Sequence, residues 1–152
     1  MKTIFRSILF VSIAALLAVS CKDEDAKPSN TELLTAKSWT VTSFTLSGQD
    51  LTEYFSEECE NDDSTKFGKD GKLTIDNGSV KCYSSEPQTE ENGTWVFESN
   101  ETKLKFTSDS GDVESYDIDE LTATTLKVSS TFSDTLNGVA VSGKLVITFT
   151  SK

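Results

Sequence analysis

The stretch of sequence that decides the fold, residues 93–121, reads GTWVFESNETKLKFTSDSGDVESYDIDEL. Within it Trp95 and Phe97 stand two residues apart, and so do Leu104 and Phe106, with Lys103 and Lys105 at the alternate positions of the second pair. A period of two is the pattern of a half-buried β-strand, because successive side chains of a strand point to opposite faces. Polar interruptions rich in Ser, Asn, Asp and Gly separate the alternating runs. The stretch therefore predicts three consecutive strands joined by short turns.

The same period continues on both sides of this stretch. Further strands are predicted at residues 38–46, 64–67, 72–75, 80–83, 126–132, 139–142 and 144–150. Together with the three above these are ten short stretches, which we interpret as about eight strands, and no helix of ten or more residues separates them. A parallel sheet needs such crossovers, so the pattern predicts an antiparallel meander, closed as a barrel or folded as a sandwich.

Two details refine the meander. Trp39 and Val41 share a parity, whereas Phe44 and Leu46 have the other, which predicts either a β-bulge or a strand that changes side. The sequence Gly-Lys-Asp-Gly at residues 68–71 predicts a hairpin turn between two strands.

Two short helical turns are predicted outside the strands. The first, over residues 31–37, offers Leu33 and Leu34 as a plug for one end of a barrel. The second is amphipathic and contains Leu51, Tyr54 and Phe55.

The first twenty residues resemble a secretory signal. Two basic residues precede an apolar run of about a dozen residues, too short to cross a bilayer as a helix. The run ends Leu-Ala-Val-Ser-Cys at residues 17–21, which resembles the lipobox of bacterial lipoproteins. That resemblance implies cleavage before Cys21 and acyl chains, palmitate among them, on Cys21. The alternative is an ordinary cleaved signal with an incidental Cys.

Residues 21–30 have no apolar periodicity and are interpreted as a linker to a domain at residues 31–152. Lys22, Asp23, Glu24 and Asp25 resemble the export signal that sends Bacteroidetes lipoproteins to the outer face of the outer membrane. The alternative is a linker that is only solvated. We expect an outer-membrane protein, anchored by lipid and exposed on the cell surface.

The composition excludes several function classes. The chain has 14 basic and 25 acidic residues, a formal net charge of −11, and no His. Histidine general bases, His-based metal sites and Ser-His-Asp or Cys-His catalysis are therefore absent. An acidic chain without a basic stripe is a poor nucleic-acid binder. We expect no catalytic residue, no cofactor and no resident metal.

The cysteines other than Cys21 are Cys59 and Cys82. An exported protein reaches an oxidising compartment, in which disulfides persist, and the two residues bracket one Gly-rich hairpin. A structural disulfide is the preferred interpretation. A redox-active pair is the alternative, although it usually has Cys-x-x-Cys spacing.

The order of these features resembles the lipocalin-like domain of Bacteroidetes lipoproteins. The resemblance rests on Leu33, Leu34 and Trp39, then Cys59 and Cys82 around Phe67 and an Asp-Gly turn, then Gly-Thr-Trp at residues 93–95 and residues 121–126. It covers about residues 31–152 and implies an all-β fold, an antiparallel up-and-down barrel of about eight strands.

Five residues are candidates for ligand or metal contacts. Asp62, Asp63 and Asp70 have the carboxylates that Ca²⁺ prefers, but they lack the alternating acidic pattern and final Glu of an EF-hand loop, so a solvated acidic loop is the preferred interpretation. Trp39 and Trp95 are candidates to stack on an apolar ligand or a sugar, and the alternative is that both are core residues.

Two short motifs resemble the Bacteroidetes O-glycosylation site, Asp followed by Ser or Thr and a small or apolar residue. They place the sugar acceptors at Ser64 and Thr135. The alternative is a chance match in a chain rich in Ser and Thr.

These observations predict a non-enzymatic, surface-anchored monomer that binds a small apolar molecule in its lumen or a partner at its open end. The alternative is an interaction or structural module with a filled core, such as an adhesin or an accessory of an outer-membrane complex. The volume of the lumen discriminates them, because an eight-stranded barrel holds either its own side chains or one small ligand.

Overall fold

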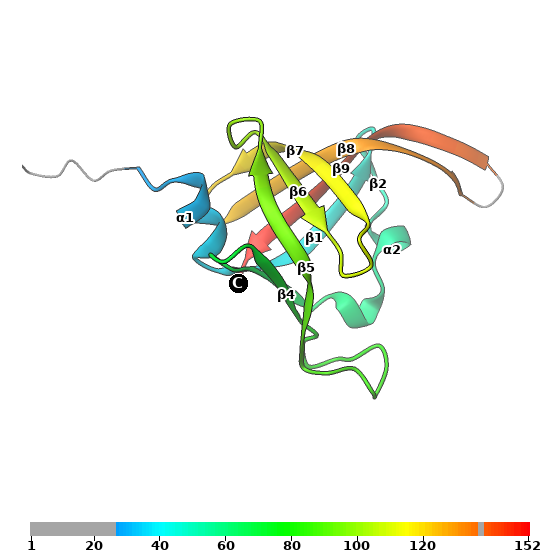
Figure 1. Cartoon of the computed structure of the whole chain (residues 1–152). Helices are drawn as coiled ribbons and strands as arrows, with labels where there is room; N and C mark the ends of the chain where they lie inside the picture. The colour runs from blue at the N-terminus through cyan, green and yellow to red at the C-terminus, as the bar shows by residue number, and fades with distance from the viewer. Residues whose placement is uncertain (1–26, 137–138) are drawn as a thin grey trace, which may run out of the picture.

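The computed structural model describes residues 27–136 and 139–152. Its strands are β1 (Ser38–Leu46), β2 (Gln49–Asp50), β3 (Ser64–Phe67), β4 (Lys72–Asp76), β5 (Thr89–Glu98), β6 (Lys103–Thr107), β7 (Val113–Leu121), β8 (Thr125–Leu136) and β9 (Val139–Ser151). Two short α-helices, α1 (Asn30–Thr35) and α2 (Thr52–Phe55), and a 3-10 helix, η1 (Glu58–Glu60), complete the fold (Figure 1).

The strands form one antiparallel sheet that closes on itself. Its order is β2-β1-β3-β4-β5-β6-β7-β8-β9, and β1 also pairs with β9. The strands β1 and β3–β9 thus make an eight-stranded barrel, which confirms the predicted fold class. The seam between β1 and β3 is short, since only Ser38 and Trp39 of β1 pair with β3.

A β-bulge in β1 explains the change of parity in its sequence. Val41 pairs with Phe149 and Phe44 with Ile147, and the register shifts between Val41 and Ser43. The extra residue returns Phe44 to the face that Val41 occupies, because Phe149 and Ile147 share one face of β9. The bulge interpretation is confirmed.

Helix α1 covers one end of the barrel. A capping box between Ser29 and Glu32 starts the helix. The Leu34 side chain is completely buried in the core, while Leu33 is half-buried. Lys66 of β3 donates through its Nζ to the carbonyl of Thr35 at 3.0 Å. The predicted plug is therefore present, with Leu34 as its main side chain.

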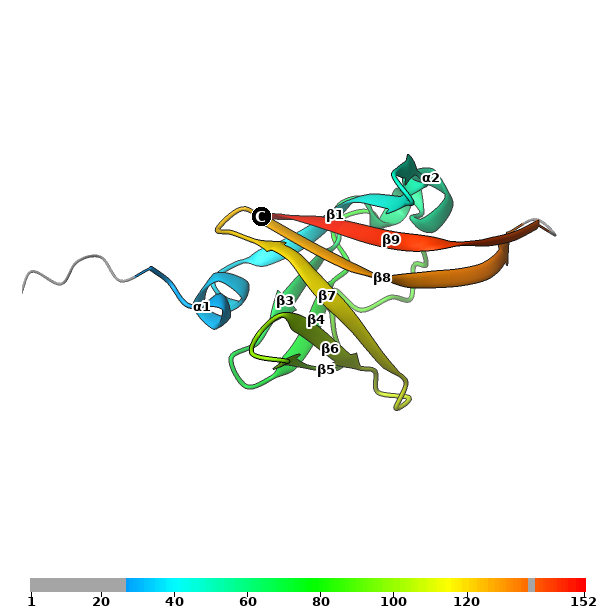
Figure 2. The ribbon, with the colours of Figure 1, turned by 90° about the horizontal axis from the view of Figure 1, so that it is seen from above.

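The opposite end of the barrel carries the long connections. They are β1–β3, which contains α2 and η1, then β4–β5 and β6–β7. Figures 1 and 2 show α1 and α2 at opposite ends. Phe55 of α2 packs between Phe44 and Phe132, with ring centroids 5.5 Å from each. The predicted amphipathic turn is thus present, although Tyr54 is half-exposed.

The hairpin of β8 and β9 extends beyond the barrel. β8 pairs with β7 only as far as Ser129, and β9 begins to pair with β1 at Leu145. Past these residues the two strands pair only with each other within the described residues. They form a two-stranded arm that projects at the end away from α1 (Figure 2).

Two strand predictions were wrong. Residues 80–83 are a loop of bends rather than a strand, and the stretches 139–142 and 144–150 belong to the single strand β9. The strand runs through Gly143, which pairs with Phe132. A side chain at Gly143 would meet the Oγ of Ser47, so a larger residue there would require the Ser47 side chain to move. The glycine does not end the strand.

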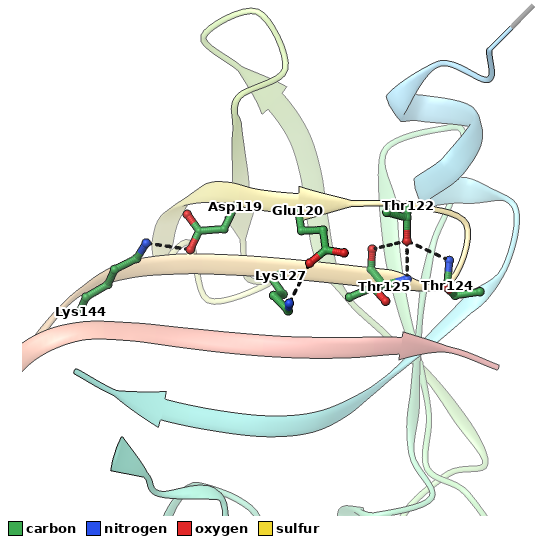
Figure 3. Close-up of polar contacts among 7 residues, drawn as sticks. All are labelled: Asp119, Glu120, Thr122, Thr124, Thr125, Lys127 and Lys144. Atoms are coloured by element: carbon green, nitrogen blue, oxygen red, sulfur yellow. Dashed lines mark hydrogen bonds and ion pairs between the residues drawn. The ribbon is translucent and has the colours of Figure 1, made fainter. Parts of the chain in front are cut away.

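The outer face of β7, β8 and β9 carries ion pairs and a polar turn (Figure 3). Lys144 lies 2.8 Å from Asp119, and Lys127 lies 2.7 Å from Glu120. The Oγ1 of Thr122 accepts hydrogen bonds from the backbone N–H groups of residues 124 and 125, which fixes the β7–β8 turn. Exposed pairs of this kind contribute at most about 1 kcal/mol each, so the interior determines the stability.

The interior is an apolar cluster built from all sides of the barrel. Its buried hydrophobic residues are Leu34, Trp39, Phe67, Leu73, Trp95, Leu104, Leu126 and Val128. They lie toward the end that α1 covers, which leaves the other end of the lumen to the site described next.

Candidate functional site

The lumen holds a cavity of about 420 Å³. Its apolar lining consists of Phe67, Leu73, Ile75, Phe106, Val128, Ile147 and Phe149. Its polar lining consists of Thr65, Asn92, Ser108, Ser110, Asp112, Glu114 and Tyr116. The lumen is therefore not filled by its own side chains, and its volume lies within the ordinary range of ligand pockets, about 300–1,000 Å³.

Strand pairing explains the apolar walls. Phe67 stands opposite Leu73, and Val128 stands opposite Ile147. Residues opposite each other in an antiparallel pair point to the same face of the sheet. The alternation seen in the sequence thus places apolar side chains of neighbouring strands together on the inner face.

Aromatic rings form one side of the interior. Phe67 contacts both Trp95 and Phe106, with ring centroids 5.6 and 6.1 Å apart. Phe106 in turn meets Tyr116 in an edge-to-face arrangement at 5.7 Å. The aromatic wall therefore runs from the closed core to the polar end of the cavity.

The polar end of the cavity is called its mouth and comprises Asn92, Ser108, Ser110, Asp112 and Glu114. Most of these residues belong to the β6–β7 loop, at the barrel end away from α1. The Ser110 Oγ donates to Asp112 Oδ2 at 2.6 Å, and the Asp112 N–H donates to Ser108 Oγ at 3.1 Å. The loop thus holds its own shape and fixes the Asp112 carboxylate.

Tyr116 and Glu114 lie two residues apart on the inner face of β7. The Tyr116 hydroxyl donates to Glu114 Oε2 at 2.7 Å. Burial raises the pKa of Tyr116 above its ordinary value, and the bond to Glu114 raises it further. Tyr116 therefore stays neutral at physiological pH and serves as a hydrogen-bond donor to the carboxylate.

The mouth lacks a positive charge. Its two ionisable acids are Asp112 and Glu114, and no Lys or Arg lines the cavity in the part of the chain that the structure describes. The ion pairs of the described residues involve neither of them.

Both tryptophans lie in the core and outside the cavity lining. Trp39 donates through Nε1 to the Leu34 carbonyl at 2.8 Å, and Trp95 donates to the Gly68 carbonyl at 3.0 Å. Neither indole is among the lining residues. This placement corrects the hypothesis that Trp39 and Trp95 contact a lumen ligand. Both indole N–H groups already donate to backbone carbonyls, and both rings are buried in the core.

The mouth was missed in the sequence, although one signal for it was present. Glu114 has the same parity as Tyr116 and Ile118, so the alternation places it on the inner face of β7. A charged side chain is ordinarily expected on the solvent-facing side of a strand, so the charge of Glu114 argues against this placement. The β6–β7 loop gave no periodic signal for Ser108, Ser110 or Asp112.

Cys59 and Cys82 form a disulfide, with 5.2 Å between their Cα atoms. The bond joins the β1–β3 connection to the β4–β5 connection. Asp62 strengthens the same junction, since its Oδ2 accepts from the backbone N–H of Ser79 at 2.7 Å and from its Oγ at 2.6 Å. These bonds lower the pKa of Asp62 below its ordinary value.

The three aspartates considered for Ca²⁺ do not form one site. Asp70 lies in the β3–β4 turn, where its Oδ1 accepts from the Lys72 N–H at 3.1 Å. Asp62 is held by Ser79, and Asp63 Oδ1 is a buried oxygen without a hydrogen-bond partner. Within the described ranges, none of these aspartates belongs to a group of three or more potential ligands whose ligand atoms lie within 4.8 Å of one another.

The candidate sugar acceptors have different environments. Ser64 lies in β3 with 8% of its surface exposed, so its hydroxyl is not accessible to a glycosyltransferase in the folded protein. Thr135 is exposed on the projecting arm and remains a prediction. Cys21 and the segment Lys22, Asp23, Glu24 and Asp25 lie outside the described residues.

Comparison with known proteins identifies the domain. A search of curated proteins finds no match. The family model of the lipocalin-like domain matches residues 35–128, from the end of α1 to β8. The matched region contains every cavity-lining residue except Ile147 and Phe149, both on β9. The match covers more than half of the chain, and the observed closed antiparallel barrel agrees with it: the chain belongs to the lipocalin-like domain family.

Proposed function

We propose that this protein is a non-enzymatic binding protein that takes a small, mainly apolar molecule into its barrel. The observation that carries the proposal is the cavity of about 420 Å³, with its apolar walls and polar mouth. A molecule that moves from water onto these walls gains about 25 cal/mol for each Å² of apolar surface that it buries, before the costs of immobilisation.

The absence of His from the whole sequence supports a binding role over catalysis. Cys59 and Cys82 are bonded to each other and offer no nucleophile.

The proposal includes a lipid anchor at Cys21 and exposure on the cell surface. Support comes from the sequence around residues 17–21 and from the acidic run that follows it. No helix among the described residues is long and apolar enough to cross a membrane. An acylated Cys21 with two or three chains gives stable attachment, whereas one chain does not.

A neutral, environment-sensitive dye tests the lumen. N-phenyl-1-naphthylamine fluoresces strongly only in apolar surroundings, so its emission reports entry into the cavity. We expect saturable binding to the wild-type protein. Ile147→Trp adds bulk to the cavity wall and is expected to abolish the signal.

The matched control is Val96→Trp, which adds the same ring to the exposed outer face of β5. This variant should bind the dye as the wild type does. Equal dye binding by Ile147→Trp and the wild type, with both proteins folded, would place the dye outside the lumen and refute the proposal.

A specific observation favours a second candidate function, docking of a protein partner at the open end. Among the described residues, four of the exposed large apolar side chains lie on connections or strand ends there: Tyr54, Val80, Tyr83 and Val113. Two of them are Tyr, a residue type that is enriched in protein–protein interfaces. The protein would then serve as an adhesin or as an accessory of an outer-membrane complex.

Cross-linking on intact cells separates the two candidates. A photoreactive group at Tyr83 should join a defined partner if docking occurs, and Tyr54→Ser with Val80→Ser should weaken that product. The dye should bind these variants normally, since none of the three residues lines the cavity.

A further inference from the structure

We infer that the lumen selects amphiphiles whose head group is a cation, a protonated amine or a quaternary ammonium, and rejects carboxylates. The inference rests on the proposed function, because it names the ligand class of the same cavity. Its basis is the arrangement of charge and hydrogen-bond donors at the mouth.

The hydroxyl donors of the mouth already serve the protein's own acceptors. The Ser110 hydroxyl donates to Asp112 Oδ2, and the Tyr116 hydroxyl donates to Glu114 Oε2. The other oxygens, Asp112 Oδ1 and Glu114 Oε1, receive no hydrogen bond from the described residues. A head group next to these two carboxylates therefore meets free acceptor oxygens, and it pairs with them by supplying donors or positive charge.

The charge of the cavity points the same way. Asp112 and Glu114 are its ionisable acids, and no basic side chain lines it within the described residues. A ligand carboxylate would lie against these acids without a compensating cation, and like charges in a half-enclosed site repel. An ammonium group would instead form an ion pair with Asp112 or Glu114, neither of which has one among the described residues.

The aromatic pair next to Glu114 adds to the selectivity. Phe106 stands directly opposite Glu114 in the β6–β7 pair, and it meets Tyr116 at 5.7 Å between ring centroids, with both rings in the cavity lining. Cations bind favourably to aromatic faces, and quaternary ammonium groups are recognised in this way. The apolar tail then lies on Val128, Ile147 and Phe149, on the far wall of the lumen.

The test uses three ligands with the same eight-carbon chain: n-octylamine, n-octanol and octanoate. At pH 7 the amine is protonated, as a lysine side chain is, and the acid is ionised. Isothermal titration of residues 22–152, the domain with its linker, should show octylamine binding roughly tenfold more tightly than octanol, the usual scale of a charge-assisted hydrogen bond. Octanoate should bind most weakly.

Variants locate the effect. Glu114→Gln and Asp112→Asn should each reduce the preference for octylamine over octanol severalfold. Asp109→Asn removes the same charge from the same loop outside the cavity lining and should leave the preference unchanged. Added salt should also reduce the preference, because it screens exposed charge. If Glu114→Gln fails to fold, the ratio of octylamine to octanol affinity in the wild type and in Asp112→Asn still tests the inference.

The outcomes are distinguishable. If octanol or octanoate binds as tightly as octylamine, the cavity binds apolar chains but the inferred head group is wrong. If none of the three binds and the dye is also excluded, the proposed function itself is wrong. A preference for octylamine that survives Glu114→Gln together with Asp112→Asn would also overturn the inference.

Discussion

The indole N–H of Trp39 donates a hydrogen bond of 2.8 Å to the carbonyl oxygen of Leu34. Strand β1 and helix α1 are thereby joined across the tight connection between them, and both side chains are completely buried. This bond fixes the helix over the barrel end and assigns Trp39 to the structural core, away from the cavity.

Replacement of Trp39 should therefore affect stability and leave ligand binding intact. We expect Trp39→Ala to lower the free energy of unfolding by about 3–5 kcal/mol, the cost of a large cavity in a core. Trp39→Phe should lose less, about 1–3 kcal/mol, because the buried Leu34 carbonyl is left without a donor. Urea unfolding measures both, and a loss of dye affinity in folded Trp39→Phe would contradict the core assignment.

The disulfide gives the second prediction. Its loop spans 23 residues, and closing a loop of that length stabilises a fold by about 3 kcal/mol on the chain-entropy estimate. Cys59→Ser with Cys82→Ser should lower the free energy of unfolding by that amount. Reductant should destabilise the wild type equally and leave the double variant unchanged. Two free thiols in the folded, exported protein would refute the structural role.

Asp63 is a site where removal of charge should stabilise the protein. Burial raises the pKa of its carboxyl, and Asp62, Glu60 and two further acids raise it more. A raised pKa means that the ionised form is disfavoured in the folded state, so the cost is full at neutral pH. It disappears as the pH falls through that raised pKa toward the unfolded value of about 3.9.

We therefore expect Asp63→Asn to gain about 0.5–1 kcal/mol at pH 7, the scale of one partly exposed charge interaction. The gain should vanish near pH 3.5. Asp109→Asn, an exposed acid elsewhere, is the control and should change little. Destabilisation by Asp63→Asn at pH 7 would show that its carboxylate has a favourable partner.

The barrel was predictable because its signal is local. The period of two in residues 93–121 indicates which side chains share a face of the sheet. The change of parity between Val41 and Phe44 indicated a bulge or a change of side, and the register shift in β1 is that bulge. The Leu34 plug and the Cys59–Cys82 bond followed from short motifs with one simple geometric solution. Each of these features depends on few residues.

The site was not predictable because it depends on distant parts of the chain. The cavity wall combines Thr65 of β3 with Phe149 of β9, and its free volume depends on how all their rotamers meet. Trp39 and Trp95 were reasonable ligand contacts in the sequence. Their structural role becomes visible only in the structure, where both indole N–H groups donate hydrogen bonds to backbone carbonyls.

The lipid anchor gives the fourth prediction. The wild type should incorporate labelled palmitate and sediment with membranes, while Cys21→Ala should do neither. Cys59→Ser with Cys82→Ser is the matched control, because it removes two thiols and should keep the label. Membrane association of Cys21→Ala at the wild-type level would show that another feature attaches the protein.

Surface exposure gives the last prediction. If the acidic run after Cys21 is an export signal, protease added to intact cells should remove the domain. Replacing Asp23, Glu24 and Asp25 with Ala should protect it until the outer membrane is opened, because such a signal is read by a receptor and does not contribute to the fold. The same substitutions should leave the melting temperature of the purified domain unchanged, since all three precede its first helix, which begins at Asn30. A periplasmic marker that stays intact during digestion shows that the cells are sealed. Digestion of the triple variant at the wild-type rate would mean that Asp23, Glu24 and Asp25 do not direct export, and protection of the wild type would place the protein on the inner face of the membrane.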